Sequence, residues 1–137
     1  MRTLADTDYR RLLELRDGLR RFLHWSEGQA RAAGLTPAQH QLLLAVRGHP
    51  DPRGPTIGEI AGYLLVRHHS AVELIDRAVT AGLVARQPDS EDARTVRIAL
   101  TARGRQRLET LAASHLEELA RLTNQMHTLW AGLDAET

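Results

Sequence analysis

The chain has 137 residues, a formal net charge of +1 at neutral pH and no cysteine. Its length fits a single domain whose core a partner subunit could complete, and the lack of cysteine excludes disulfides, cysteine-ligated zinc and thiol-based oxidant sensing. The small net charge argues against a strongly basic protein that binds nucleic acid indiscriminately.

The first two predicted elements are helices. One runs from about residue 6 to about residue 33, with a cap among residues 6–8 and a stop at Gly34. Its apolar face consists of Tyr9, Leu12, Leu13, Leu19, Phe22 and Leu23. The second helix begins after Thr36, with Pro37 in its first turn, and ends near residue 48 ahead of a stiff turn.

Residues 56–81 contain two helical patterns separated by a tight turn. Thr56 can cap the first, whose apolar positions share one face. In the second, which runs from Arg67 to Ala81, the apolar residues repeat every three or four positions, so the opposite face is polar. The major groove of DNA accepts the polar exterior of a second helix behind a tight turn. The succession of two short helices across a tight turn therefore predicts a helix-turn-helix.

A β-hairpin is predicted directly after these helices. Residues 83–87 and 95–100 read as paired strands, and Arg97 lies on the opposite face of the second strand from its apolar residues. The loop 88–94 is too long for a two-residue turn, so its tip projects into solvent, where Arg94 could reach a narrow minor groove. Thr101 then caps the last helix. The hairpin is a wing attached to the helix-turn-helix.

The last helix has the most regular apolar pattern in the chain. The stripe passes through Leu108, Ala112, His115, Leu119, Leu122, Met126, Leu129 and Leu133. This heptad spacing predicts a coiled-coil-like seam beside another helix. The first helix supplies part of the partner surface, and we expect a second copy of the chain to supply the rest, which gives a homodimer. A seam formed within one chain stays open as the alternative.

Several short motifs in these elements share the order and spacing of one family. They are Gly82-Leu83-Val84 with Arg86, Asp92-Ala93-Arg94, Leu100-Thr101 with Gly104, Leu35-Thr36-Pro37-Ala38-Gln39, and Asp76-Arg77. Together they resemble the MarR (multiple antibiotic resistance regulator) family of bacterial winged-helix transcription factors over roughly residues 8–125.

The resemblance implies a mainly α fold with a small two-stranded β-wing (α+β), in a single domain over residues 1–137. A winged helix-turn-helix DNA-binding lobe would span about residues 36–100. A dimerisation lobe would combine about residues 6–33 with 102–133. Relatives usually continue into a further helix, whereas this sequence ends at Thr137, so we expect a smaller or differently crossed dimer.

Ten residues are predicted at the DNA interface: Thr56, Arg67, His68, His69, Ser70, Arg77, Arg86, Asp92, Arg94 and Arg97. The recognition helix begins at residues 67–70, where side chains meet base edges or phosphate. Arg94 is expected in the minor groove, with Asp92 orienting it or pairing with Arg77. Arg86 and Arg97 are expected to touch the DNA backbone, and the resemblance implies that Thr56 donates to a phosphate.

A ligand pocket is predicted from polar residues that could meet in an apolar crevice: Arg16, His24, Trp25, His40 and His115. Such a set suits an organic carboxylate or a phenol, because the histidines and arginine can hydrogen-bond it while the indole covers its ring. Metal sensing is an alternative, but the seven histidines do not form pairs with metal-ligand spacing on one helical face. No cofactor and no metal are predicted.

The predicted function is a sequence-specific regulator that binds double-stranded DNA at a palindromic operator. We expect a homodimeric repressor that a small organic ligand releases, and not an enzyme, because no catalytic constellation has workable spacing. The alternatives are a winged-helix module that binds proteins and a metal-responsive regulator. The amino terminus is too polar for a signal peptide and no apolar run has membrane-spanning length, so the expected location is the cytoplasm.

Overall fold

The computed structural model describes residues 3–135. In this part of the chain it contains five helices and one two-stranded antiparallel sheet, so the predicted mainly α fold with a small β-wing is confirmed. The chain forms two compact units. We call the part up to Gln29 and from Ala112 onward the helical unit, and residues 30–111 the winged unit.

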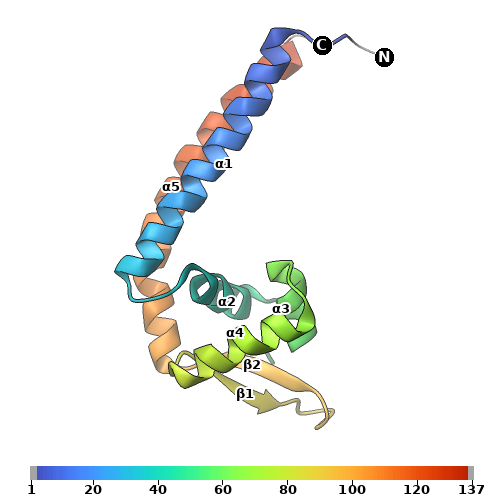
Figure 1. The fold of residues 1–137 in the computed structure, drawn as a ribbon, viewed down its shortest axis with the longest axis vertical. Helices are drawn as coiled ribbons and strands as arrows, with labels where there is room; N and C mark the ends of the chain where they lie inside the picture. Colours follow the sequence, from blue (N-terminus) through green and yellow to red (C-terminus); the bar gives the residue numbers. More distant parts are fainter. Residues whose placement is uncertain (1–2, 136–137) are drawn as a thin grey trace. The chain divides into compact units, whose positions relative to one another are not determined.

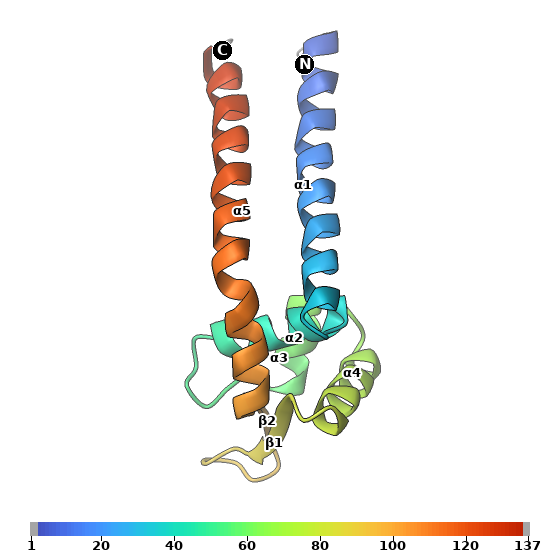
Figure 2. The ribbon, with the colours of Figure 1, turned by 90° about the vertical axis from the view of Figure 1, so that its left-hand side faces the viewer.

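The helical unit holds most of two long antiparallel helices, α1 (Asp6–Ala32) and α5 (Ala102–Ala135), which lie side by side (Figures 1 and 2). Asp8 caps α1 from within the first turn, because its carboxylate accepts a hydrogen bond of 2.8 Å from the backbone N–H of Ala5. Side chains of α5 reach α1 at Gly18, where an added Cβ would lie 2.9 Å from Cε of Met126. A larger side chain at this position would require the flexible end of Met126 to shift.

Much of the predicted apolar surface of the helical unit is exposed in the single chain. Phe22 on α1 and the α5 residues Leu122, Met126 and Leu129 are half-buried. The exposed apolar residues are Tyr9, Leu12, Leu13, Leu19 and Leu23 on α1 and Leu116 and Leu119 on α5. The side chains of Trp130 and Leu133 lie outside the described residues. The α5 stripe therefore packs only in part against α1.

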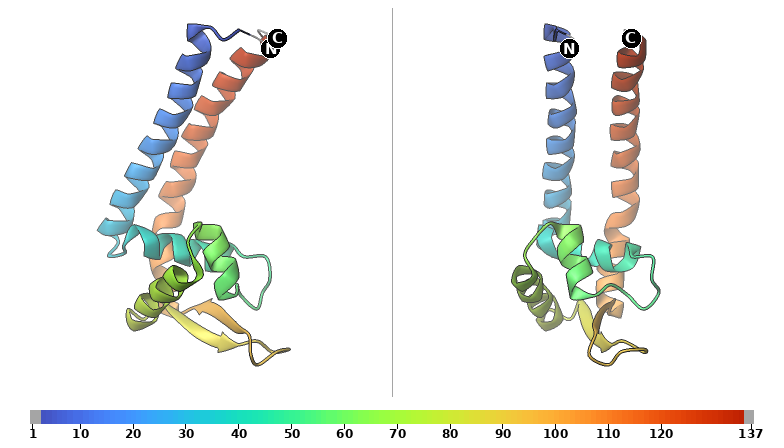
Figure 3. Two further views of the ribbon diagram at one scale, coloured as in Figure 1. Left: turned by 45° about the vertical axis from the view of Figure 1, so that its right-hand side comes forward. Right: turned by 90° about the vertical axis from the view of Figure 1, so that its right-hand side faces the viewer.

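The winged unit follows the predicted order closely (Figure 3). It contains α2 (Pro37–Gly48), α3 (Ile57–Leu64), α4 (His68–Thr80), β1 (Val84–Pro88) and β2 (Val96–Leu100). Thr36 and Thr56 each complete a capping box, with Gln39 and Glu59 respectively, which fixes where α2 and α3 begin. The two strands pair from Val84 with Leu100 to Pro88 with Val96, and their loop projects beyond the three helices.

The core of the winged unit joins its helices to the hairpin. Leu42, Leu43, Ile60, Ile75 and Ile98 have no exposed surface. The predicted cap at Thr101 is confirmed, since its hydroxyl accepts from the backbone N–H of Gly104 at 3.1 Å. Gly104 leaves room for the chain before β1, because a Cβ there would lie only 2.0 Å from the carbonyl oxygen of Leu83. These contacts hold the hairpin against the helices.

Candidate nucleic-acid interface

Helix α4 presents a polar start and an apolar flank. Its residues Ala71, Ile75 and Ala78 are buried in the core of the winged unit. The predicted DNA contacts at its start are on the other side: Arg67, His68 and His69 are exposed and Ser70 is partly exposed, as is expected of groove-facing residues. Arg67 is the N-cap but makes no side-chain capping bond, so the first backbone N–H groups of α4 can receive a phosphate. Arg77, near the end of α4, is also exposed.

The turn before α4 contains a residue that the sequence did not single out. Leu65 has φ of 55°, in the left-handed region that non-glycine residues seldom adopt, and it is 91% exposed. Its backbone N–H donates hydrogen bonds to the carbonyl oxygens of Ala61 and Gly62 and so caps the end of α3. This conformation reverses the chain within a short turn, so α4 begins at His68, soon after α3 ends at Leu64.

The wing tip is organised around one aspartate. Oδ1 of Asp92 accepts hydrogen bonds from the backbone N–H of Arg94 at 3.0 Å and from its Nε at 3.3 Å. Oδ2 of Asp92 accepts from the hydroxyl of Thr95 at 3.4 Å. The side chain of Arg94 is 93% exposed. Asp92 therefore makes the orienting contact that the sequence predicts, and it leaves the guanidinium of Arg94 open to solvent.

The two arginines of the hairpin strands differ in what they contact. Arg86, with a side chain 37% exposed, pairs with Asp76 of α4 and so ties β1 to the recognition helix. Arg97 has a side chain only 11% exposed, and its Nη1 donates to the carbonyl oxygen of Gly54 at 2.9 Å. The prediction that Arg97 touches the DNA backbone requires an exposed guanidinium. The structure places it inside, because the loop before α3 covers that side of β2.

An ion-pair cluster at the loop end of the hairpin was also missed by sequence reasoning. Arg53 lies between Asp51, whose Oδ2 is 2.8 Å from its Nη2, and Asp89, whose Oδ1 is 3.2 Å from its Nη1. The hydrogen bonds from Arg53 hold the pKa of the Asp51 carboxyl well below its ordinary value. Likewise, the hydrogen bond from the Thr56 backbone lowers the pKa of Glu59. Both carboxylates are thus ionised at neutral pH.

The predicted ligand residues are divided between the two units. In the helical unit, Nε2 of His115 lies 2.8 Å from Oγ of Ser26, and its ring centroid is 4.8 Å from that of Trp25. Arg16 and His24, on α1, are exposed. His40 is buried in the winged unit. Only the Trp25 and His115 part of the prediction is brought together within one unit.

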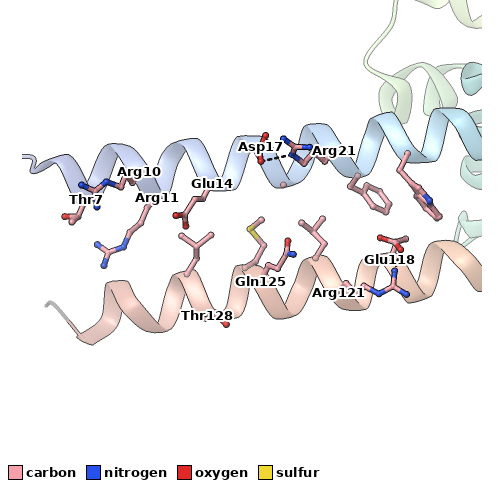
Figure 4. A pocket seen from close by; sticks show the side chains of 16 residues that line it. Thr7, Arg10, Arg11, Glu14, Asp17, Arg21, Glu118, Arg121, Gln125 and Thr128 are labelled. Atoms are coloured by element: carbon pink, nitrogen blue, oxygen red, sulfur yellow. Dashed lines mark hydrogen bonds and ion pairs between the residues drawn. The ribbon is translucent and has the colours of Figure 1, made fainter.

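A groove of about 860 Å³ runs between α1 and α5 in the helical unit (Figure 4). Among the predicted ligand residues, Trp25 lines it. Apolar side chains such as Phe22, Leu122 and Met126 line it together with charged ones. The charged lining residues are Arg10, Arg11, Arg21, Arg121, Glu14, Asp17 and Glu118. No group of metal-ligating side chains was found among the described residues, and no helix there is long and apolar enough to cross a membrane.

An exposed polar start of α4, together with a hairpin that carries a solvent-facing arginine at its tip, defines a winged helix-turn-helix protein. A family model described as MarR family matches residues 33–95. The transcriptional activatory protein BadR of Rhodopseudomonas palustris is 36% identical over 81 residues, or 59% of this chain. The matched part is 46% of BadR, so it spans about half the length of that relative.

Solved structures show the same fold. The MarR family transcription regulator SP03579 has a TM-score of 0.75 at 23% identity, with 96% of this chain and 86% of that chain covered. A mutant of MepR from S. aureus bound to an oligodeoxyribonucleotide has a TM-score of 0.64 at 17% identity, with 98% and 96% covered. Residues 33–95 therefore resemble the MarR family, as the sequence motifs predict. Proteins of this family are transcription regulators, so the prediction of a regulator and not an enzyme is confirmed at the level of the family.

Proposed function

We propose that this chain is a sequence-specific regulator that binds double-stranded DNA as a homodimer and represses transcription. The observation that carries the proposal is Arg94, which is 93% exposed at the wing tip and held there by Asp92. In this arrangement α4 enters the major groove and Arg94 enters the adjacent minor groove, where a narrow groove attracts a guanidinium. Because such a regulator acts where the DNA is, we place it in the cytoplasm.

The proposed contacts divide into base-reading and positioning groups. Residues 67–70 and Arg77 read base edges or phosphate from the exposed side of α4. Thr56 donates its hydroxyl hydrogen to a phosphate, since its oxygen accepts the capping bond from Glu59 and the hydrogen stays available. Arg86 reaches the backbone with the exposed part of its side chain. Asp92 orients Arg94 without touching DNA, and the burial of Arg97 removes it from the contact set.

Homodimer formation is supported by the exposed leucines of the helical unit. Leu13 is 67% exposed and Leu116 is also 67% exposed, and apolar groups gathered on a surface in this way mark an interface. Two recognition helices related by a two-fold axis would meet successive major grooves about 34 Å apart, which fits a palindromic operator.

Release by a small organic ligand is part of the same proposal. Trp25 contacts His115, and His115 in turn hydrogen-bonds Ser26. This group offers an aromatic face beside two hydrogen-bonding side chains, which suits a phenol or an aromatic carboxylate. Such a ligand would release DNA if it bound more tightly to an arrangement of the dimer that does not fit the operator.

Activation of transcription is the second candidate, because the matching relative from Rhodopseudomonas palustris is named a transcriptional activatory protein. The two candidates use the same DNA-binding surface. They differ in whether the operator overlaps the promoter or lies upstream of it, and transcription in vitro from promoters of both arrangements distinguishes them.

Selection of bound duplexes from a random pool tests the DNA-binding proposal. We expect an enriched inverted repeat whose half-sites are about one helical turn apart, with affinity that falls steeply as salt rises. A pool without enrichment, or an affinity that salt does not change, would contradict the proposal.

A further inference from the structure

The loop between α2 and α3 lies directly against the wing. The backbone N–H of Ile98 in β2 donates to the carbonyl oxygen of Pro55 at 2.9 Å, and Thr56 forms an isolated β-bridge with Arg97. Gly54, with φ of 89°, permits this approach, because a Cβ there would lie 2.3 Å from the carbonyl oxygen of Ile98. The loop thus extends the edge of the two-stranded sheet and brings its own charged side chains to the loop end of the hairpin.

Arg53 connects this loop to the other strand of the hairpin. It contacts Asp51 within the loop, and its Nη1 lies 3.2 Å both from Oδ1 of Asp89 and from Oε2 of Glu91 in the wing loop. The Asp89 side chain is only 6% exposed, so this carboxylate is held among its partners and is shielded from water. One guanidinium therefore connects two segments that lie 36 residues apart in the sequence.

Arg97 makes the second connection. Besides its hydrogen bond to the Gly54 carbonyl, it lies 3.6 Å from Oδ2 of Asp89, 3.7 Å from Oδ2 of Asp51 and 3.8 Å from Oε1 of Glu59. Its Nε is buried without a hydrogen-bond partner among the described atoms. Removing either arginine leaves Asp89 with weaker compensation in a place that solvent barely reaches.

We infer that Arg53, Arg97, Asp51 and Asp89 form a clasp that fixes the wing on the helix-turn-helix and so positions Arg94 for the minor groove. The inference rests on the proposed DNA-binding function. The clasp residues are positioning residues and do not touch DNA. Asp89 begins the seven-residue segment to Thr95 that carries Arg94, and the backbone N–H of Asp89 donates to the Thr95 carbonyl at 2.9 Å. The clasp thus holds the base of the loop that presents Arg94.

The charge of the cluster argues against direct contact with DNA. Four carboxylates, on Asp51, Glu59, Asp89 and Glu91, surround the two arginines, so negative charge is in excess. A site with excess negative charge repels phosphate. Electrostatics alone therefore predicts that neutralising Asp89 tightens DNA binding. The clasp predicts the opposite, because the amide loses the ion pairs that fix the wing.

The test compares Asp89→Asn with the unmodified protein on the selected duplex. We expect Asp89→Asn to weaken DNA binding about threefold or more. The control is Glu109→Gln, which neutralises an exposed carboxylate on α5, outside both α4 and the clasp, and should leave affinity unchanged or raise it. Unchanged or tighter binding by Asp89→Asn would overturn the clasp.

A second comparison separates positioning from general weakening. In an Arg94→Ala background, Asp89→Asn should cause no further loss, since the contact that the clasp positions is already gone. Additive losses would overturn the clasp. If Arg94→Ala alone has no effect, the proposed wing contact fails; if Arg94→Ala weakens binding and Asp89→Asn does not, only the clasp fails.

Arg53→Lys provides a test that keeps Asp89 itself and the positive charge of its partner. Lysine keeps the charge but cannot bridge Asp51 and Asp89 in the same way, because its ammonium is a single point charge and not a planar fork. Arg53 is 36% exposed, so the variant should fold, which circular dichroism checks. If Arg53 instead contacted a DNA phosphate directly, lysine would keep that contact, because it keeps the positive charge. The clasp predicts that Arg53→Lys loses about as much DNA affinity as Asp89→Asn. Binding as tight as that of the unmodified protein would contradict it.

Discussion

The winged unit closes its own hydrophobic core, whereas the helical unit leaves a large part of its apolar surface exposed. In the winged unit Leu42, Leu43 and Ile75 have no exposed surface. In the helical unit Leu13 and Leu23 are 67% and 53% exposed. The contrast indicates that the fold of the winged unit is specified within one chain, while the leucines of α1 and α5 are suited to a surface supplied by another molecule.

The largest effect should come from opening the core of the winged unit. Leu42→Ala should lower the free energy of unfolding by about 2–5 kcal/mol, because it removes buried methyl groups and leaves a cavity. Denaturant titration measures this loss. Leu44→Ala, on the same helix but 56% exposed, should stay within about 0.5 kcal/mol of the unmodified protein. Similar losses for the two variants would contradict the description of this core.

The exposed apolar surface of the helical unit can be tested by introducing a charged residue into it. Leu13→Glu should weaken dimer association by about 2 kcal/mol or more, roughly 30-fold, since a carboxylate would be buried against apolar groups. Sedimentation equilibrium measures the association constant. Leu44→Glu, an exposed leucine of the winged unit, is the matched control and should leave association unchanged. An unmodified protein that is monomeric at micromolar concentration, or a dimer indifferent to Leu13→Glu, would count against the proposed interface.

The smallest expected effect is the dependence of stability on acidic pH. The pKa of the Asp51 carboxyl is lowered mainly by its hydrogen bond with Arg53, and that of Glu59 by the Thr56 backbone. A lowered folded-state pKa contributes stability that is present above the ordinary carboxyl pKa and is lost as pH falls through the folded value. Thermal unfolding from about pH 7 to about pH 2.5 should therefore show a steeper loss below about pH 4 for the unmodified protein than for Asp51→Asn. Parallel curves would contradict the role assigned to Asp51.

The local elements of the winged unit were predictable because each carries its own signal. Thr36 and Thr56 mark the starts of two helices through capping boxes. The alternation of apolar residues predicts a strand over residues 95–100, within one residue of its observed start. The orienting contact of Asp92 with Arg94 was also predictable, because the two residues are only two positions apart.

Contacts between distant segments were not predictable in the same way. Alternation places Arg97 opposite the core-facing residues of β2, but it gives no sign that the loop at Gly54 covers that side. The stretch from Asp51 to Pro55 reads as a turn, and nothing local pairs Arg53 with Asp89. In the helical unit, the spacing of His24 and His115 did not reveal that His115 contacts Trp25 and Ser26 while His24 stays exposed.

The most direct test of the whole account is the affinity of Arg94→Ala for the selected duplex, measured with the association state of the protein followed in parallel. We expect binding to weaken by about 1–3 kcal/mol with the dimer intact, because a wing-tip contact is lost and the helical unit is untouched. An affinity equal to that of the unmodified protein would remove the wing from DNA recognition and contradict the account.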